Sequence, residues 1–127
     1  MVFETGVIEE FEAAHALIGK EFGPASKLHS HTYKVEAKVS GEALSNSGVL
    51  CDITLLRDAL HNELQKFHYN VLNDVPELNG SNTTAEAIAK FIHHGIREKI
   101  KETRSIESLT VTVWENEKSY ASFAERV

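Results

Sequence analysis

The chain of 127 residues has few cysteines, no long apolar run and no excess of positive charge. Its one cysteine, Cys51, excludes an internal disulfide and a metal site built from several thiolates, which fits a reducing compartment. No apolar run approaches the roughly 20 residues that a membrane helix needs. The N-terminal residues, with Glu4, Glu9 and Glu10, lack the basic and then apolar plan of a signal peptide. We therefore expect a cytoplasmic protein that does not enter a membrane.

The net charge of −6 gives no basic surface of the kind that binds nucleic acid. A small anionic substrate is still compatible with this charge, because it would meet only the local field of its site. With 42% apolar residues, the chain is long enough for one hydrophobic core and too short for two comfortable ones. Residues 1–127 are therefore expected to form a single domain.

Hydrophobic periodicity predicts the order strand, strand, helix, helix, strand, strand. Two helices with one apolar stripe each need a sheet face to cover. We therefore expect an α+β fold, in which a four-stranded antiparallel sheet carries both helices on one face. The predicted strands span 2–15, 30–43, 109–115 and 119–125, the helices begin after residues 52 and 83, and loops occupy 16–28 and 70–82.

Polar residues mark where the two helices begin. Asp52 is placed to cap the first helix, which should end near Phe67. Thr83 and Glu86 have the spacing of a capping box at the start of the second helix. Within that second helix, the adjacent residues His93 and His94 cannot face one site together and are interpreted as solvated.

The strongest chemical signal is a pair of histidines, His29 and His31, where the second strand begins. Side chains repeat every two residues along a strand, so both imidazoles lie on its apolar side, with their Cα atoms roughly 7 Å apart. His15 ends the first strand in line with Phe11 and Ala13. Three imidazoles can bind zinc and leave a fourth position for water or substrate. The alternative interpretation from spacing alone is that the rings only pack against the core.

Glu115 is the most informative residue outside the histidines. It ends a row of alternating aliphatic residues that includes Val111 and Val113, so its carboxylate is predicted to point toward the buried layer. A charge in that layer must be paired or hydrogen-bonded. Its two oxygens suit the two parallel N–H donors of a planar, guanidine-like edge. The alternative is that the strand ends at Trp114 and that Glu115 faces solvent.

Six stretches of the chain form a recognisable set of motifs. They are F-E-A-A-H at 11–15, K-L-H-S-H-T-Y-K-V at 27–35, G-V-L-C-D-I-T-L-L at 48–56, V-L-N at 71–73, T-T-A-E at 83–86 and V-T-V-W-E at 111–115. Together they resemble the 6-pyruvoyltetrahydropterin synthase and 6-carboxytetrahydropterin synthase family, from about residue 11 to residue 120. The resemblance implies the family's sheet-and-two-helix tunnelling fold, and a homotrimer or homohexamer with sites at subunit boundaries.

The resemblance also implies roles for single residues. The zinc ligands would be His15, His29 and His31, with Ser30 in place of the glycine that the family has between the last two. Glu115 matches the glutamate that holds the pterin ring. The site threonine near the ring matches Thr84, although Thr83 and Ala87 replace a proline and an asparagine of that motif.

The residues of the family that transfer protons are all replaced in this sequence. Ala25 stands where the resemblance places a cysteine base, four residues before His29. His68 and Tyr69 stand where it places an aspartate and a histidine. An imidazole can accept a proton at neutral pH, so His68 is our candidate catalytic base, with Glu21 as the alternative.

The function that the resemblance implies is that of a zinc-dependent lyase acting on the small-molecule pterin 7,8-dihydroneopterin triphosphate or a close relative. Lys20 and Lys27 flank the loop that leads to the histidine pair and can meet a triphosphate, although lone loop lysines are more often solvated. One alternative is a catalytically weak paralogue that binds pterin and zinc. Another is a variant enzyme that cleaves the dihydroneopterin side chain by a retro-aldol step.

Overall fold

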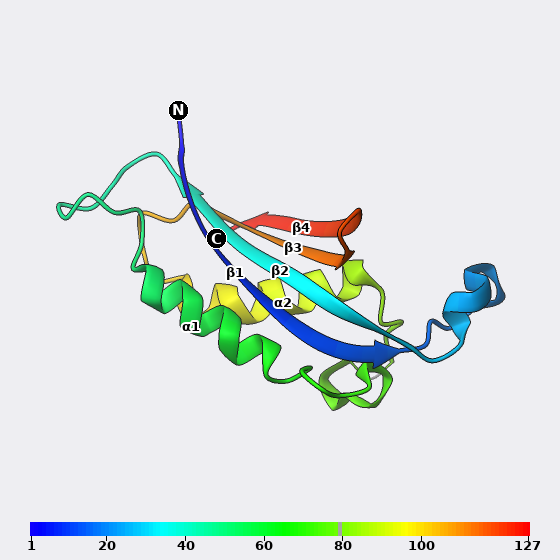
Figure 1. Cartoon of the computed structure of the whole chain (residues 1–127). Coiled ribbons are helices and arrows are strands. Elements are labelled where there is room, and N and C mark those ends of the chain that lie inside the picture. The colour runs from blue at the N-terminus through cyan, green and yellow to red at the C-terminus, as the bar shows by residue number, and fades with distance from the viewer. Residues whose placement is uncertain (79) are drawn as a thin grey trace.

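The computed structural model describes residues 1–78 and 80–127. Its sheet has four antiparallel strands, and two helices lie against one face of it (Figure 1). The predicted fold class and element order are confirmed. The strands are β1 (Phe3–His15), β2 (His29–Gly41), β3 (Ser108–Asn116) and β4 (Ser119–Arg126), and the helices are α1 (Ile53–Leu64) and α2 (Ala85–Ile100).

The strands lie in the order β1-β2-β3-β4, so β1 and β4 form the two edges. β1 and β2 pair along their whole length, from Phe3 opposite Gly41 to His15 opposite His29. The pairing of β2 with β3 begins only at Lys34, opposite Trp114. The far end of the β1–β2 pair therefore projects beyond β3, as Figure 1 shows, and all three predicted zinc ligands lie on this projecting end.

The helices cover the face of the sheet that carries the aliphatic rows. α1 packs against β1, and α2 packs against β3 and β4. The helices contribute leucines and isoleucines at helical spacing, and β2 and β3 contribute every second residue, as the two periodicities require. The fully buried side chains include Leu56, Leu60, Leu64, Ile88, Ile92, Ile96, Val35, Val111 and Val113.

Helix ends differ in detail from the predictions. The Asp52 side chain accepts a hydrogen bond from the Thr54 amide at 2.9 Å, so the predicted cap of α1 is confirmed. α1 ends at Leu64 rather than near Phe67, and turns continue the chain beyond it. The predicted cap of α2 is wrong by one residue, because Thr84 accepts from the Ala87 amide at 3.2 Å. Thr83 is thereby free for another contact.

The prediction that both α2 histidines are solvated is wrong for His93. Its side chain is 1% exposed, and its Nε2–H donates to the Leu109 carbonyl at 2.9 Å. The ring also meets Phe123 of β4 edge-on, with 4.8 Å between ring centroids. Only His94 faces solvent. Sequence spacing missed the buried position because it depends on how far β4 extends over the helix.

The two predicted loops contain short helical turns. Residues Lys20–Ser26 form a 3-10 segment with no buried residue, and it projects from the molecule beyond the ends of β1 and β2 (Figure 1). The predicted loop 70–82 contains the turns Leu72–Asp74 and Pro76–Leu78, while its residue 79 lies outside the described residues. In the described part of the chain, no helix is long and apolar enough to cross a membrane.

Candidate metal and pterin site

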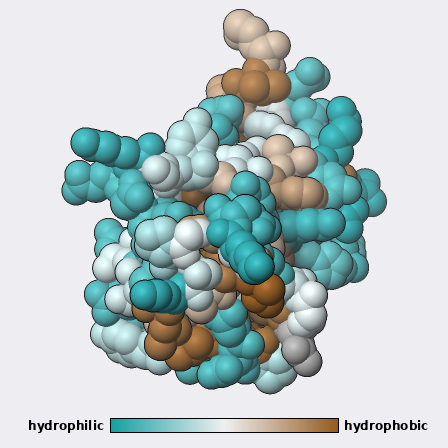
Figure 2. All heavy atoms as spheres, turned by 90° about the vertical axis from the view of Figure 1, so that its right-hand side faces the viewer, coloured by the Kyte–Doolittle hydropathy of each residue, from teal (hydrophilic) through white to brown (hydrophobic). Residues whose placement is uncertain are grey.

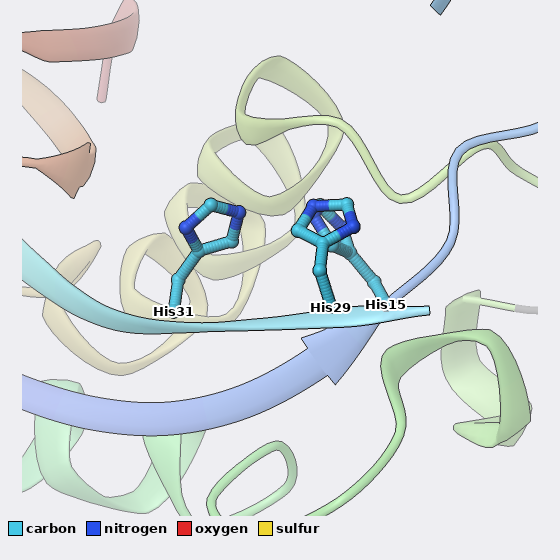
Figure 3. A group of neighbouring side chains, drawn as sticks. All are labelled: His15, His29 and His31. Carbon is cyan, nitrogen blue, oxygen red and sulfur yellow. The ribbon is translucent and has the colours of Figure 1, made fainter. Parts of the chain in front are cut away.

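The structure brings His15, His29 and His31 together. One ring nitrogen from each residue lies within 4.8 Å of the other two. The three imidazoles rise from the same face of the β1–β2 pair and converge near the N-terminal end of α2 (Figure 3). Because His15 and His29 are directly opposite each other in the register and His31 follows two residues later, strand geometry alone aligns the three side chains on one face.

Hydrogen bonds fix the rings of two of these histidines. The Nδ1–H of His15 donates to the Thr83 carbonyl at 2.8 Å, and the Nδ1–H of His29 donates to the Lys27 carbonyl at 2.7 Å. Since a carbonyl can only accept, each ring carries its proton on Nδ1 and keeps the Nε2 lone pair available. This is the arrangement in which a second hydrogen bond orients a metal-binding imidazole. The donor set therefore fits a metal that prefers nitrogen ligands.

The protonation of the histidines suits ligation as well. Burial lowers the pKa of His15 and the neighbouring imidazoles lower it further, which outweighs the opposite effects of the Thr83 hydrogen bond and the Glu115 charge. Burial likewise lowers the pKa of His31, although the Glu115 carboxylate and the backbone of Glu115 act in the opposite direction. A metal binds the neutral ring, so lowered pKa values favour binding at neutral pH.

Tyr33 lies beneath the triad on the same row of β2. Its ring is fully buried and stacks on Phe11, with 4.8 Å between ring centroids. Its hydroxyl lies 3.3 Å from the Nε2 atom of His15. Burial raises the pKa of the Tyr33 hydroxyl, and the Glu115 carboxylate raises it further, so this group stays protonated.

Glu115 sits at an irregularity of β3. Trp114 pairs with Tyr120 and Asn116 pairs with Ser119, so the register shifts at Glu115, which has no opposite residue. Such a bulge re-aims a side chain. Glu115 is half-buried, and its charge acts on His15, His31 and Tyr33. The carboxylate thus lies on the triad side of the sheet.

Two clefts open beside His31, the one residue of the triad that lines them among the described residues. One, of about 610 Å³, is lined by His31 and Glu115 together with Lys34 and Trp114. The other, of about 430 Å³, lies between His31 and Tyr69 at the edge of β1. A smaller hollow of about 120 Å³ lies between Glu115 and the first turn of α2. Glu115, the residue predicted to bind the pterin ring, therefore borders open space on two sides.

Thr84, the predicted ring neighbour, is half-buried and caps α2 through its side chain. Its neighbour Thr83 is 1% exposed, and the Thr83 hydroxyl lies 3.2 Å from Nδ1 of His15. Sequence reasoning missed this role of Thr83, which was interpreted only as a cap. No local signal reveals it, since Thr83 and His15 are 68 residues apart.

His68 lies at the outer edge of β1. The Glu12 amide donates to its Nδ1 atom at 3.1 Å, and its ring stacks on that of Tyr69 at 3.8 Å between centroids. Tyr69 itself has a φ of 61°, a left-handed conformation that is rare for a bulky residue. In the part of the chain that the structure describes, the hydrogen bond and ring contact of His68 go to these neighbours and not to the triad.

Ala25 and Glu21 belong to the projecting 3-10 segment. The Ala25 carbonyl accepts a hydrogen bond from the Leu17 amide at 3.0 Å, while Glu21 is exposed. Lys20 and Lys27 at the two ends of the segment are exposed too. Figure 2 faces this end of the molecule, where hydrophilic residues cover most of the surface and hydrophobic residues show in the lower part and at the top of the view.

Comparison with known proteins finds a matching family model and sequence relatives. The model of the family described as 6-pyruvoyl tetrahydropterin synthase matches residues 4–126. A 6-carboxy-5,6,7,8-tetrahydropterin synthase of Bacillus subtilis is 28% identical over 75% of this chain and 66% of its own length. A 6-pyruvoyl tetrahydrobiopterin synthase of Dictyostelium discoideum is 30% identical over 74% of this chain and 78% of its own length.

A solved structure shares the fold. The 6-pyruvoyl tetrahydropterin synthase of Caenorhabditis elegans superposes with a TM-score of 0.86, covering 98% of this chain and 96% of that one at 22% sequence identity. At that identity the likeness concerns the fold alone. The two sequence relatives carry names for different products, a 6-carboxy and a 6-pyruvoyl pterin.

Proposed function

Because the chain belongs to the 6-pyruvoyl tetrahydropterin synthase family of lyases in pterin metabolism, we propose that it is a zinc-dependent lyase acting on 7,8-dihydroneopterin triphosphate or a close relative. The observation that carries the proposal is the convergence of His15, His29 and His31, with the rings of His15 and His29 oriented through Nδ1. These residues would hold the metal. Bound zinc supplies Lewis acidity, which lowers the pKa of a hydroxyl on the substrate side chain.

Glu115 and Thr84 would bind the pterin ring. The half-buried Glu115 lines two hollows, of which the larger is also lined by His31, and its two carboxylate oxygens can accept the paired N–H groups of a planar ring edge. Thr84 stands at the start of α2, next to the smaller hollow that Ala85 and Glu86 line. The ring would thereby be held in one orientation relative to the histidines, which favours reaction by positioning alone.

The proton transfer is where this chain departs from the family pattern. Ala25 provides no thiol, and Cys51 does not replace it, since Cys51 is buried and burial raises the pKa of its thiol. We retain His68 as the proposed base. Its Nδ1 accepts the Glu12 amide hydrogen bond, so taking up a proton there must displace that bond. Glu21, exposed on the projecting segment, is the alternative.

The lack of a thiol favours a second pair of candidate functions. The chain would be a catalytically weak paralogue that binds pterin and zinc, or a variant enzyme that cleaves the dihydroneopterin side chain by a retro-aldol step. Incubating zinc-loaded protein with dihydroneopterin triphosphate and identifying the products by mass spectrometry separates the three. Released free triphosphate supports the lyase, whether the pterin product keeps its side chain or carries a carboxyl group. A shortened side chain whose triphosphate stays on the excised aldehyde fragment supports the retro-aldol reaction, and unchanged substrate supports the paralogue.

The Ala25→Cys variant sharpens this test. A gain of synthase activity on restoring the thiol means that the remainder of the site is intact. Positioned acid–base groups typically contribute about 10² to 10⁴ in rate, so the gain should be of that order. His68→Ala measured in parallel asks whether His68 carries the residual activity. Wild-type synthase activity that survives His68→Ala would rule out His68 as the base.

We also propose a ring-shaped homotrimer or homohexamer with sites at subunit boundaries. Among the described residues, β4 pairs only with β3, and the first part of β1 pairs only with β2, so both edges expose backbone groups. Closing several subunits into a barrel would pair those edges. Sedimentation at tens of micromolar would test this, and a monomer would contradict it.

A further inference from the structure

One metal ligand lies on an edge strand and the other two do not. His29 and His31 belong to β2, which pairs with β1 on one side and, from Lys34 onward, with β3 on the other. His15 is the last residue of β1, an edge strand, and the chain leaves the sheet directly after it. On the side of His15 that faces away from β2, contacts must therefore come from residues outside the sheet.

The loop after α1 supplies those residues. Along the outer edge of β1 and beyond it, the backbone N–H of every second residue from 12 to 18 donates to an acceptor from residues 68–82. The pairs are Glu12 to Nδ1 of His68 at 3.1 Å, Ala14 to the Asn70 carbonyl at 3.2 Å, Ala16 to Oδ1 of Asn73 at 2.9 Å, and Ile18 to Oδ1 of Asn82 at 3.0 Å.

The last two acceptors are side-chain amides that bind in both directions. The Nδ2 atom of Asn73 donates to the Ala16 carbonyl at 2.8 Å, and that of Asn82 donates to the Ile18 carbonyl at 3.1 Å. An asparagine side chain carries both a donor and an acceptor, so it can pair with a residue as a neighbouring strand would. Asn73 and Asn82 thus continue the sheet edge past the point at which β1 ends.

The two asparagines act on His15 from different sides. Asn73 fixes Ala16, the residue directly after His15. Asn82 directly precedes Thr83, whose carbonyl orients the His15 ring, so the Asn82 amide ties that carbonyl to the same stretch of chain. Backbone and ring of the one edge-strand ligand are therefore held by one loop.

We infer that Asn73 and Asn82 are positioning residues for the metal ligand His15, an inference that rests on the proposed metal site. Loss of either amide frees the chain after His15 and loosens the ligand without removing it. Replacing groups that orient metal ligands typically lowers metal affinity about 10- to 100-fold, and we expect a fall of that size for Asn82→Ala and for Asn73→Ala.

The experiment measures zinc affinity by competition with a chromophoric chelator, and the visible absorption of the cobalt-substituted protein. Asn70→Ala is the matched control. Among the described residues, the Asn70 side chain donates only to the Lys66 carbonyl, and the Asn70 backbone carbonyl, which accepts from the Ala14 amide, remains in the variant. Asn82→Asp keeps the acceptor for the Ile18 amide and loses the donor. It should bind zinc with an affinity between those of wild type and Asn82→Ala. If Asn82→Ala does not fold, a zinc affinity of Asn82→Asp below that of wild type still tests the inference.

The outcomes separate this inference from the proposed function. Weaker zinc binding and an altered cobalt spectrum in the Asn73 and Asn82 variants, with an unchanged Asn70→Ala control, support it. Lower thermal stability with unchanged zinc affinity and an unchanged spectrum overturns it, since that is the result of a purely structural role. A wild-type protein that binds no zinc refutes the metal site itself.

Discussion

The helix-covered part of the sheet and its projecting end use the same alternation of side chains for different chemistry. Under α2, the row on β3 includes Val111 and Val113, both fully buried. Toward the projecting end, the same face carries Glu115 and then the histidines. The alternation of side chains decides which face of the sheet a residue occupies. How far the helices cover that face decides whether the residue lies in the hydrophobic core or beside a cleft.

The two regions should therefore respond differently to substitution. The covered part gains its stability from burial of apolar area, which contributes roughly 25 cal/mol per Å². The projecting end buries His15 and half-buries His29, His31 and Glu115, and polar groups removed from water must be hydrogen-bonded or bind a ligand to be tolerated. Damage to the covered part should lower stability and leave the site intact in folded molecules, whereas damage to the end should remove binding and leave the fold.

The largest expected effect is loss of the metal from the projecting end. The double variant His29→Ala, His31→Ala leaves one imidazole of three, too few to hold a metal tightly. Elemental analysis should find about one zinc per wild-type chain and none in the variant. His94→Ala, which alters an exposed histidine on α2, is the control and should keep its metal. Unchanged stoichiometry in the double variant would refute the site.

The next effect breaks the covered region instead. Leu60→Ala removes a side chain that is 1% exposed in the core, and such a change costs about 2–5 kcal/mol of unfolding free energy. Denaturant titration should show this loss, while Leu44→Ala, at a position that is 40% exposed, changes little. Folded Leu60→Ala protein should still bind zinc. Loss of zinc in that folded variant would mean that the two regions are not independent.

A smaller effect concerns the carboxylate at the boundary. Glu115→Gln keeps the shape of the side chain but loses its charge and one acceptor edge. Pterin binding, measured by calorimetry, should weaken by about 1.5–3 kcal/mol, the usual contribution of hydrogen bonds to a charged group. Glu102→Gln alters an exposed glutamate that lines none of the clefts described above, and it serves as the control. Equal affinity in wild type and Glu115→Gln would remove Glu115 from the ring site.

The smallest effect is a pH dependence shared by both regions. Burial lowers the pKa of His93 in the covered part, and of His15 and His31 at the projecting end. The unfolded chain then binds more protons than the native one as pH falls through the ordinary histidine pKa near 6.5. The unfolding free energy of the metal-free protein should therefore be highest above that pH. It should decrease as the pH drops further, until the histidines of the native protein are protonated as well.

His93→Gln divides this dependence between the regions. Glutamine keeps a donor for the Leu109 carbonyl but does not titrate, so the loss of unfolding free energy between pH 7.5 and 5.5 should become smaller. The remainder belongs to the projecting end. An identical pH profile in wild type and His93→Gln would show that His93 does not contribute.

Most of the fold followed from local pattern. The alternation from Tyr33 to Val39 and the isoleucine stripe of α2 each depend on side chains within one element, so periodicity predicted them. The placement of His15, His29 and His31 on a shared face followed from the same period of two. The bulge at Glu115 did not, since a register shift depends on the length and turn of the partner strand.

The element order, the face of each strand and the set of three histidines could be predicted from the amino-acid sequence, because each of these is a property of neighbours along the chain. Three features depend on the packing of the elements: β3 and β4 bury His93, Thr83 turns to His15 instead of capping α2, and Asn73 and Asn82 continue the edge of β1. Those contacts join residues 16 to 68 positions apart. A side chain's choice among such distant partners is set by how the elements pack, and no local period records it.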